Sequence, residues 1–161
     1  MKIEILNECP DCLPTMDRRR FVKSAALGTA ALAAAPLGQA AKKKADTETL
    51  VAQLFGSLND SQKKVVAFPF EHPLREKVDN NWHITKARVK SYTKDQQAMI
   101  KEIFMGLHSE EYAEKVLQQV AGDSGKSGFE GGSAVAVFGK PGTGKFEFVL
   151  TGRHCTRRCD G

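Results

Sequence analysis

The chain has 161 residues, a formal net charge of +5 and a hydrophobic content of 41%. This length suits one domain with a sizeable core and excludes an array of large domains. The positive charge does not indicate nucleic-acid binding, because the chain lacks a basic stretch interleaved with aromatic residues, the pattern that follows a phosphate backbone.

The first part of the chain has the pattern of an export leader. Arg18-Arg19, with Phe21 two residues later, resembles the twin-arginine translocation signal. A charge-free, Ala-rich run follows from Ser24 to Ala41, and Gly38-Gln39-Ala40 fits a small-residue cleavage site, so we predict cleavage after Ala40. These features predict a periplasmic or secreted protein that is exported folded, with the twin-arginine export machinery as its partner.

Two other interpretations of this run are an Ala-rich surface helix and a membrane anchor. Gly28, Pro36 and Gly38 interrupt the run, which falls short of the ~20 strongly apolar residues that a stable span needs. We therefore expect no stable membrane span after cleavage. Residues 41–46, with Lys42-Lys43-Lys44, form either a solvated linker or a basic segment that discourages the general secretory route.

An N-terminal extension, Met1 to Thr15, precedes the signal and contains Cys9-Pro10-Asp11-Cys12. Such a C-x-x-C pair could hold half of a metal site or cycle as a dithiol, but it lacks the βαβ context of a redox motif. The extension would be removed with the leader. Met16 is an alternative start, which would leave the pair untranslated.

The chain beyond Ala40 is predicted to form one domain over residues 47–161. Removal of residues 1–40 takes away five basic and four acidic residues, leaving a formal charge of +4, of which three charges belong to the linker. Because the folded part is nearly balanced in charge, no nucleic-acid partner is expected.

Helical periodicity dominates the first half of this domain. Thr47 to Leu58 is predicted to be a helix, with a second short helix over Gln62 to Phe68 that Pro69 ends. The first helix has apolar residues on one face at Leu50, Val51, Leu54, Phe55 and Leu58. Phe70 to Lys90 shows no period and is expected to be an ordered loop or a short strand around Trp82.

Two further helices are predicted after this segment. Thr93 and Gln96 form a capping box for a helix that runs to about Leu107, and Ser109 begins the next helix, which Gly122 ends. Their expected inward residues are Met99, Ile100, Ile103, Phe104 and Leu107 in the first, and Tyr112, Val116, Leu117 and Val120 in the second. The Gly-rich stretch Gly122 to Gly132 is expected to be a mobile loop.

The C-terminal region predicts strands. Ala134 to Phe138 and Phe146 to Leu150 are rich in Val and Phe and favour an antiparallel hairpin. The fold class is thus α+β, with N-terminal helices packed on an antiparallel sheet of which only the first hairpin is present. Because the chain stops at Cys159-Asp160-Gly161 with no element to cover an open strand edge, we expect a truncated C-terminal part.

The turn of this hairpin, Gly139 to Lys145, nearly matches the phosphate-binding loop G-x-x-x-x-G-K-[ST]. Phe146 stands where a Ser or Thr hydroxyl would bind magnesium, and a strand follows where the motif needs a helix. Its Pro and Gly residues favour a plain hairpin turn instead.

The segment Arg153 to Asp160 contains the densest group of candidate site residues. His154, Cys155 and Cys159 could supply three zinc ligands, although their spacing matches no zinc finger or ribbon. A disulfide between Cys155 and Cys159 would need a turn, since an extended strand puts residues i and i+4 ~13 Å apart. A buried thiol beside a hydrogen-bonded His is the simplest interpretation, and Cys–His catalysis would require a third, orienting group.

A second cluster combines Phe68-Pro69-Phe70 with Trp82-His83. These rings could line a pocket in which His83 carries a proton, or they could pack a loop against the core.

Several blocks of the domain resemble the bacterial family catalogued as domain of unknown function 3500. They are Leu58-Asn59-Asp60-Ser61-Gln62, Val66-Ala67-Phe68-Pro69-Phe70, Asn81-Trp82-His83-Ile84-Thr85, the helical pair around Gln96 to Val120, Phe148-Val149-Leu150-Thr151-Gly152-Arg153-His154 and Arg158-Cys159-Asp160-Gly161. The resemblance covers Thr47 to Gly161 and implies a family domain that continues past Gly161. The family has no established activity, so the resemblance implies no mechanism.

Two function classes follow from these residues. One is an exported hydrolase-like or metal- or cofactor-using enzyme with the catalytic candidates His83 and His154 in one pocket. The other is a cofactor-free binding or structural protein of the envelope, in which both clusters pack. The cofactor and the substrate are left open by the sequence.

Overall fold

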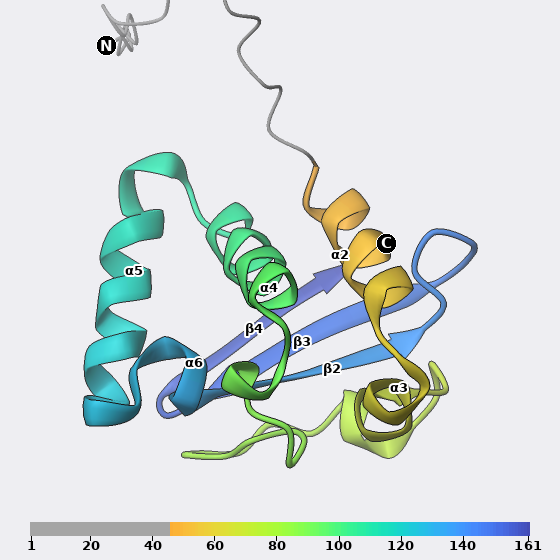
Figure 1. The fold of residues 1–161 in the computed structure, drawn as a ribbon, viewed down its shortest axis with the longest axis horizontal. Coiled ribbons are helices and arrows are strands. Elements are labelled where there is room, and N and C mark those ends of the chain that lie inside the picture. The colour runs from red at the N-terminus through yellow and green to blue at the C-terminus, as the bar shows by residue number, and fades with distance from the viewer. Residues whose placement is uncertain (1–45) are drawn as a thin grey trace, which may run out of the picture. The chain divides into compact units, whose positions relative to one another are not determined.

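A computed structural model of the chain describes residues 46–161. The predicted signal residues Arg18, Arg19 and Phe21, the cleavage position after Ala40 and the Cys9–Cys12 pair lie outside the described residues. Within residues 46–161, no helix is long and apolar enough to cross a membrane. The fold is α+β, as predicted, and consists of helices packed on a four-stranded sheet (Figure 1).

The first two helices are α2 (Thr47–Ser57) and α3 (Asp60–Val66). α2 buries Leu50, Val51 and Leu54 as its periodicity predicts. α3 begins at a capping box between Asn59 and Gln62, whose side chains and backbone N–H groups satisfy each other. The prediction that this helix reaches Phe68 is wrong, because Ala67–Phe68 forms strand β1 and pairs with a distant strand.

Helices α4 (Lys94–Gly106) and α5 (Glu110–Asp123) follow the predicted boundaries closely. The Thr93–Gln96 capping box is confirmed, and Gln96 also donates to the Ser57 carbonyl oxygen at 2.9 Å, which ties the start of α4 to the end of α2. Tyr112 is wrongly predicted to be inward: its exposed fraction is 52%, and the small Ala113 occupies the buried position.

The Gly-rich stretch after α5 is structured, which contradicts the expected mobile loop. A 3-10 turn, η4 (Gly125–Ser127), leads into the short helix α6 (Gly128–Gly132). Phe129 of α6 is buried, and its ring centroid lies 5.2 Å from that of Phe104 in α4. One aromatic side chain thus fixes a segment whose composition indicates mobility.

The sheet contains β2 (Ser133–Gly139), β3 (Phe146–Gly152) and β4 (Cys155–Asp160) in addition to β1. The strand order is β1-β2-β3-β4, with β1 parallel to β2 and the other pairs antiparallel. The predicted β2–β3 hairpin is confirmed. The expectation that the sheet is limited to this hairpin is wrong, because β4 pairs with the whole of β3 and β1 adds a fourth strand.

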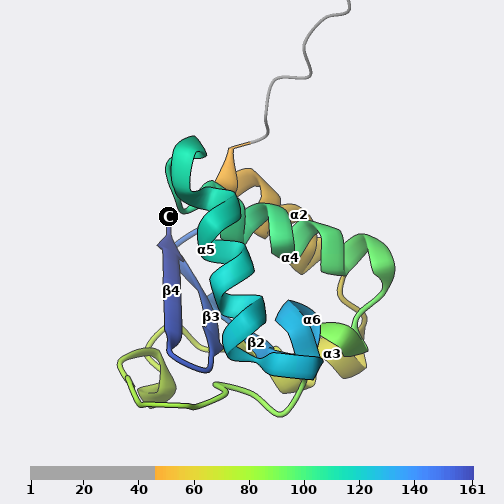
Figure 2. The ribbon, with the colours of Figure 1, turned by 90° about the vertical axis from the view of Figure 1, so that its left-hand side faces the viewer.

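The two faces of the sheet have different covers (Figure 2). On the helix face, Val135, Val137, Phe148 and Leu150 join the main core with side chains from α2, α4, α5 and α6. On the opposite face, which we call the loop face, a smaller cluster joins sheet residues to the loop over residues 69–88. It comprises Ala136, Phe138, Val149, Trp82 and Ile84. We call residues 69–88 the covering loop.

Polar contacts tie the covering loop to the strands. The Ile84 N–H donates to Thr151 Oγ1 at 2.8 Å, and Thr85 Oγ1 donates to the Val135 carbonyl oxygen at 3.0 Å. The indole N–H of Trp82 donates to Thr156 Oγ1 at 3.3 Å. The segment around Trp82 is therefore an ordered loop, one of the two structures that its lack of period allows.

Candidate functional site

Two hollows lie beside the covering loop, one at each end of the strands. The first, which we call the hairpin hollow, has a volume of about 460 Å³ and opens between the end of β1 and the β2–β3 turn. Its lining residues are Ala67, Phe68, Pro69, Phe70, Gly139, Lys140, Gly144 and Lys145. Aromatic and aliphatic side chains form one wall, and two lysines stand on the other.

The β2–β3 turn has the geometry of a hairpin and not of a phosphate-binding loop. The Lys140 N–H donates to the Lys145 carbonyl oxygen at 3.1 Å, and a strand follows Lys145 directly. Gly139 has φ of 81°, and a Cβ at this position would meet that same carbonyl oxygen. Glycine is therefore required at this point of close backbone approach.

The tip of the turn rests against the helical layer. Pro141 is buried, and a Cβ built on Gly142 would lie 3.4 Å from the Ala52 Cβ in α2. The turn is thus supported from behind, so the wall that carries Lys140 and Lys145 is preformed.

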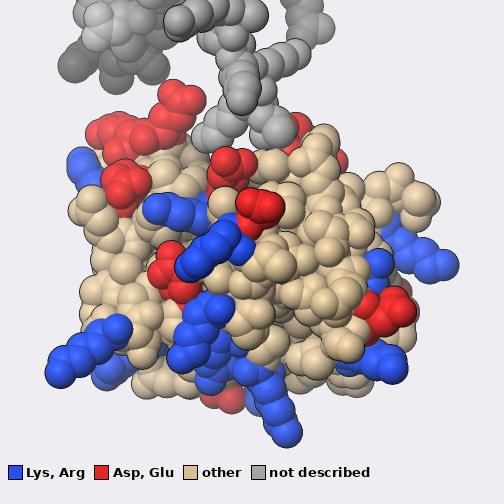
Figure 3. Space-filling model, in the orientation of Figure 1, with Lys and Arg blue, Asp and Glu red and all other residues tan. Residues whose placement is uncertain are grey.

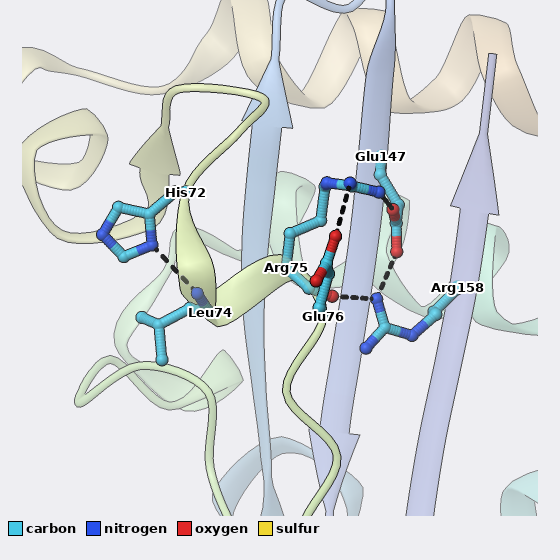
Figure 4. Close-up of polar contacts among 6 residues, drawn as sticks. All are labelled: His72, Leu74, Arg75, Glu76, Glu147 and Arg158. Carbon is cyan, nitrogen blue, oxygen red and sulfur yellow. Dashed lines mark hydrogen bonds and ion pairs between the residues drawn. The ribbon is translucent and has the colours of Figure 1, made fainter.

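A buried carboxylate lies on the loop face close to the hairpin hollow (Figure 4). Glu147 of β3 is 7% exposed and accepts hydrogen bonds from Arg75 of the covering loop, at 3.2 Å, and from Arg158 of β4. Arg158 also donates to the carbonyl oxygens of Arg75 and Lys77. The three charged side chains connect the covering loop to both strands and satisfy the charge of the carboxylate.

Arg75 also connects this network to the hairpin hollow. Its Cζ atom lies 4.5 Å from the centroid of the Phe70 ring, and Lys145 Nζ lies 5.8 Å from the same centroid. Cations over an aromatic face are attracted by its negative quadrupole. Phe70 is thereby held at the wall of the hollow by two positive groups.

The second hollow lies at the β3–β4 turn and has a volume of about 590 Å³. Its lining residues are Val78, Asp79, Asn80, His154, Cys155 and Thr156. His154 has φ of 57°, and its Nδ1 lies 3.9 Å from Asp123 Oδ2 at the end of α5. A protonated His154 would pair with this carboxylate and with the negative end of the helix dipole.

The other catalytic candidate, His83, is held at the same end of the sheet by a different polar partner. Its Nε2–H donates to the Gly132 carbonyl oxygen at 2.8 Å, which fixes the tautomer of the ring. His83 is not among the residues that line the hollow of His154. The structure therefore gives each imidazole its own polar partner and does not bring the two to one described hollow.

Cys155 and Cys159 lie on one strand, β4, and their side chains point to the helix face. Both thiols are free and buried, so the disulfide considered from the sequence does not form, because β4 is extended at these positions. Burial raises the pKa of both thiols, which disfavours the nucleophilic thiolate.

The proposed zinc ligands are not assembled by the fold. Across residues 46–161, no group of three or more His, Cys, Asp or Glu side chains is placed to hold a metal ion. The two cysteines face the helical layer, whereas His154 is at the exposed turn before β4. This strand geometry separates residues that are close in sequence.

Charges on the helix side are distributed unevenly (Figure 3). Acidic side chains gather toward the upper margin of this view, while most Lys and Arg side chains lie lower. The visible face thus carries both signs of charge.

Of the aromatic cluster considered from the sequence, Phe68, Pro69 and Phe70 line the hairpin hollow, whereas Trp82 and His83 do not. Sequence reasoning missed the lysines of this hollow and the Glu147 network. The available signal was a charged residue at Glu147 within a strand that is otherwise apolar, with Arg157-Arg158 following in the next strand. No protein-family model, curated protein or solved structure matches the chain.

Proposed function

We propose that this chain is a bacterial envelope protein exported folded by the twin-arginine route, with residues 47–161 as its functional domain. The observation that carries the proposal is the leader pattern itself: Arg18-Arg19 with Phe21, then the charge-free run from Ser24 to Ala41 and the small-residue site Gly38-Gln39-Ala40.

The same residues support a binding or structural role for the exported domain over the enzyme hypothesis. His83 and His154 have separate partners, and burial raises the pKa of both nearby thiols. The resemblance to domain of unknown function 3500 belongs to this proposal as well. Its support is the set of blocks between Leu58 and Gly161 that resemble that family.

Export is tested by replacing the arginine pair with Arg18→Lys and Arg19→Lys in the full chain, expressed in a bacterium that has the twin-arginine pathway. The receptor reads the arginines themselves, so the conservative change should hold the protein in the cytoplasm. The unchanged chain should reach the periplasm or medium and begin at Ala41 by N-terminal sequencing.

The matched control is Arg20→Lys, which makes the same chemical change one residue outside the pair and should leave export intact. A strain without the twin-arginine translocase supplies the second control. Export of the Arg18→Lys/Arg19→Lys chain at the normal level, or export that continues without the translocase, would overturn the proposal.

A further inference from the structure

The hairpin hollow combines an apolar wall with unpaired positive charge. Ala67, Phe68, Pro69 and Phe70 supply the wall, and no acidic residue is among the lining residues. Lys140 and Lys145 are exposed, and within residues 46–161 neither forms an ion pair. Acidic side chains of the fold thus leave the charge of this wall uncompensated.

Further charged side chains lie next to the aromatic wall of the hollow. Arg75 and Lys145 both lie over the Phe70 ring, and Arg75 shares the single buried carboxylate of Glu147 with Arg158. Arg75 also pairs with the exposed Glu76 at 3.3 Å, so the excess positive charge at the hollow is that of Lys140 and Lys145. Low-dielectric walls strengthen the field of such charges.

Size and shape restrict the occupant. A volume of about 460 Å³ lies within the range of small-molecule pockets, which are mostly apolar with a few polar groups that orient the ligand. Pro141 is buried and Gly142 lies close to Ala52 of α2, so the turn that carries the two lysines is supported without a ligand. The hollow therefore requires little ordering when a ligand binds.

We propose that the hairpin hollow is a binding site for a small planar aromatic anion, such as an aromatic carboxylate. The ring packs on the wall formed by Phe68, Pro69 and Phe70, and the anionic group faces Lys140 and Lys145. Apolar burial supplies affinity, and the two ammonium groups select for negative charge. This site is independent of the export proposal, since it depends only on the described domain.

The test is an NMR titration of the ¹⁵N-labelled full chain with 2-naphthoate. Amide shifts should change in a saturable way at Gly139, Gly144 and Lys145, which line the hollow. Two matched probes separate the contributions: 2-naphthamide keeps the rings without the charge, and cyclohexanecarboxylate keeps the charge without the aromatic ring. Both should bind at least about fivefold more weakly than 2-naphthoate.

Variants locate the site. Lys140→Ala/Lys145→Ala should weaken 2-naphthoate binding about fivefold or more, whereas Lys86→Ala/Lys101→Ala, which removes the same charge from exposed positions elsewhere, should leave it unchanged. Phe70→Leu keeps an apolar side chain on a half-buried position and should also weaken binding. Their amide spectra verify that each variant is folded.

The inference would be overturned by the absence of saturable shifts at the hairpin, by equal affinity for 2-naphthoate and 2-naphthamide, or by an equal loss of 2-naphthoate affinity in the two double-lysine variants. Inorganic phosphate that reproduces the same shifts with similar affinity would likewise overturn it, because the site would then recognise charge alone.

Discussion

Helices cover one face of the sheet with apolar side chains, whereas the covering loop holds the other through a few polar contacts. The helix face buries Ile100, Ile103 and Phe104 without exposure. The loop face depends on Trp82, Ile84 and the Glu147 network, and both hollows lie along it. The difference indicates that one face supplies most of the stability, while the other supplies surfaces on which ligands can act.

The largest expected effect comes from the helix face. Phe104→Ala removes a fully buried ring that contacts Phe129 and His108. The free energy of unfolding should fall by about 3–5 kcal/mol, because the transfer term and the cavity term add. Urea denaturation measures it, with an unchanged m-value expected. A loss below about 1 kcal/mol would show that the helix face is not the main source of stability.

The corresponding change on the loop face is Glu147→Ala. It leaves Arg158 without a carboxylate and Arg75 with only the exposed Glu76, and the cost should be about 2–3 kcal/mol. This is below the value for a fully buried pair because the side chains of the two arginines keep 22% and 31% of their surface exposed. Glu147→Gln, which retains acceptor capacity, is the control and should cost less. Equal losses of stability in Glu147→Ala and Glu147→Gln would show that pairing of the carboxylate charge is not the cause of the loss.

Tyr92 should make the stability of the helix face depend on pH. Its hydroxyl is buried on the helix side without a hydrogen-bond partner, and burial raises its pKa to about 12 from 10.0. The folded state therefore holds the Tyr92 proton more tightly than the unfolded state. The free energy of unfolding should be unaffected by this group below pH 10 and should fall by about 1.4 kcal/mol per pH unit between pH 10 and 12. Tyr92→Phe should remove that decline.

At neutral pH, Tyr92→Phe should be neutral or raise stability by about 1 kcal/mol, because the unpaired hydroxyl disappears. Denaturation of both proteins at several pH values between 7 and 12 gives the difference curve. Parallel curves for the two proteins would contradict burial of an unpartnered hydroxyl.

The smallest expected effect concerns the Trp82–Thr156 contact. Thr156→Val keeps the shape of the side chain but removes the acceptor of the indole N–H. Because Trp82 is 9% exposed, water can partly replace the lost acceptor, and the cost should be about 0.5–1 kcal/mol. Thr143→Val, in the exposed hairpin turn, is the matched control and should change stability by less. If Thr156→Val lost as much stability as Glu147→Ala, the Trp82–Thr156 hydrogen bond would be the main contact that holds the covering loop, contrary to this prediction.

These contacts also show which features a sequence can predict. Both capping boxes depend on residues three positions apart, so local pattern identifies them, and the β2–β3 hairpin has a local turn. β1 was missed because its pairing with Val137 and Phe138 depends on residues about 70 positions away. α6 was missed because its Gly content hides the one buried residue, Phe129, that fixes it.

The candidate site was harder to predict for the same physical reason. His154, Cys155 and Cys159 are close in sequence, but alternation along β4 points the thiols into the helical core. Conversely, Arg75 is 72 residues from Glu147 in sequence and reaches it through the covering loop. Glu147 and Arg158, 11 residues apart, meet because β3 pairs with β4. Residue types in the sequence can identify candidate site residues on one strand. Which side chains lie in contact is decided by the tertiary structure.

Native-state hydrogen exchange of the full chain tests the difference between the two faces most directly. The Ile84 amide, bonded to Thr151 Oγ1, reports on the covering loop, and the amide of Ile103 in α4 reports on the helix face. Ile84 should exchange through an opening of lower free energy and weaker dependence on denaturant than Ile103, which should require global unfolding. Equal opening free energies with equal denaturant dependence would mean that the two faces open as one unit, and would contradict the account.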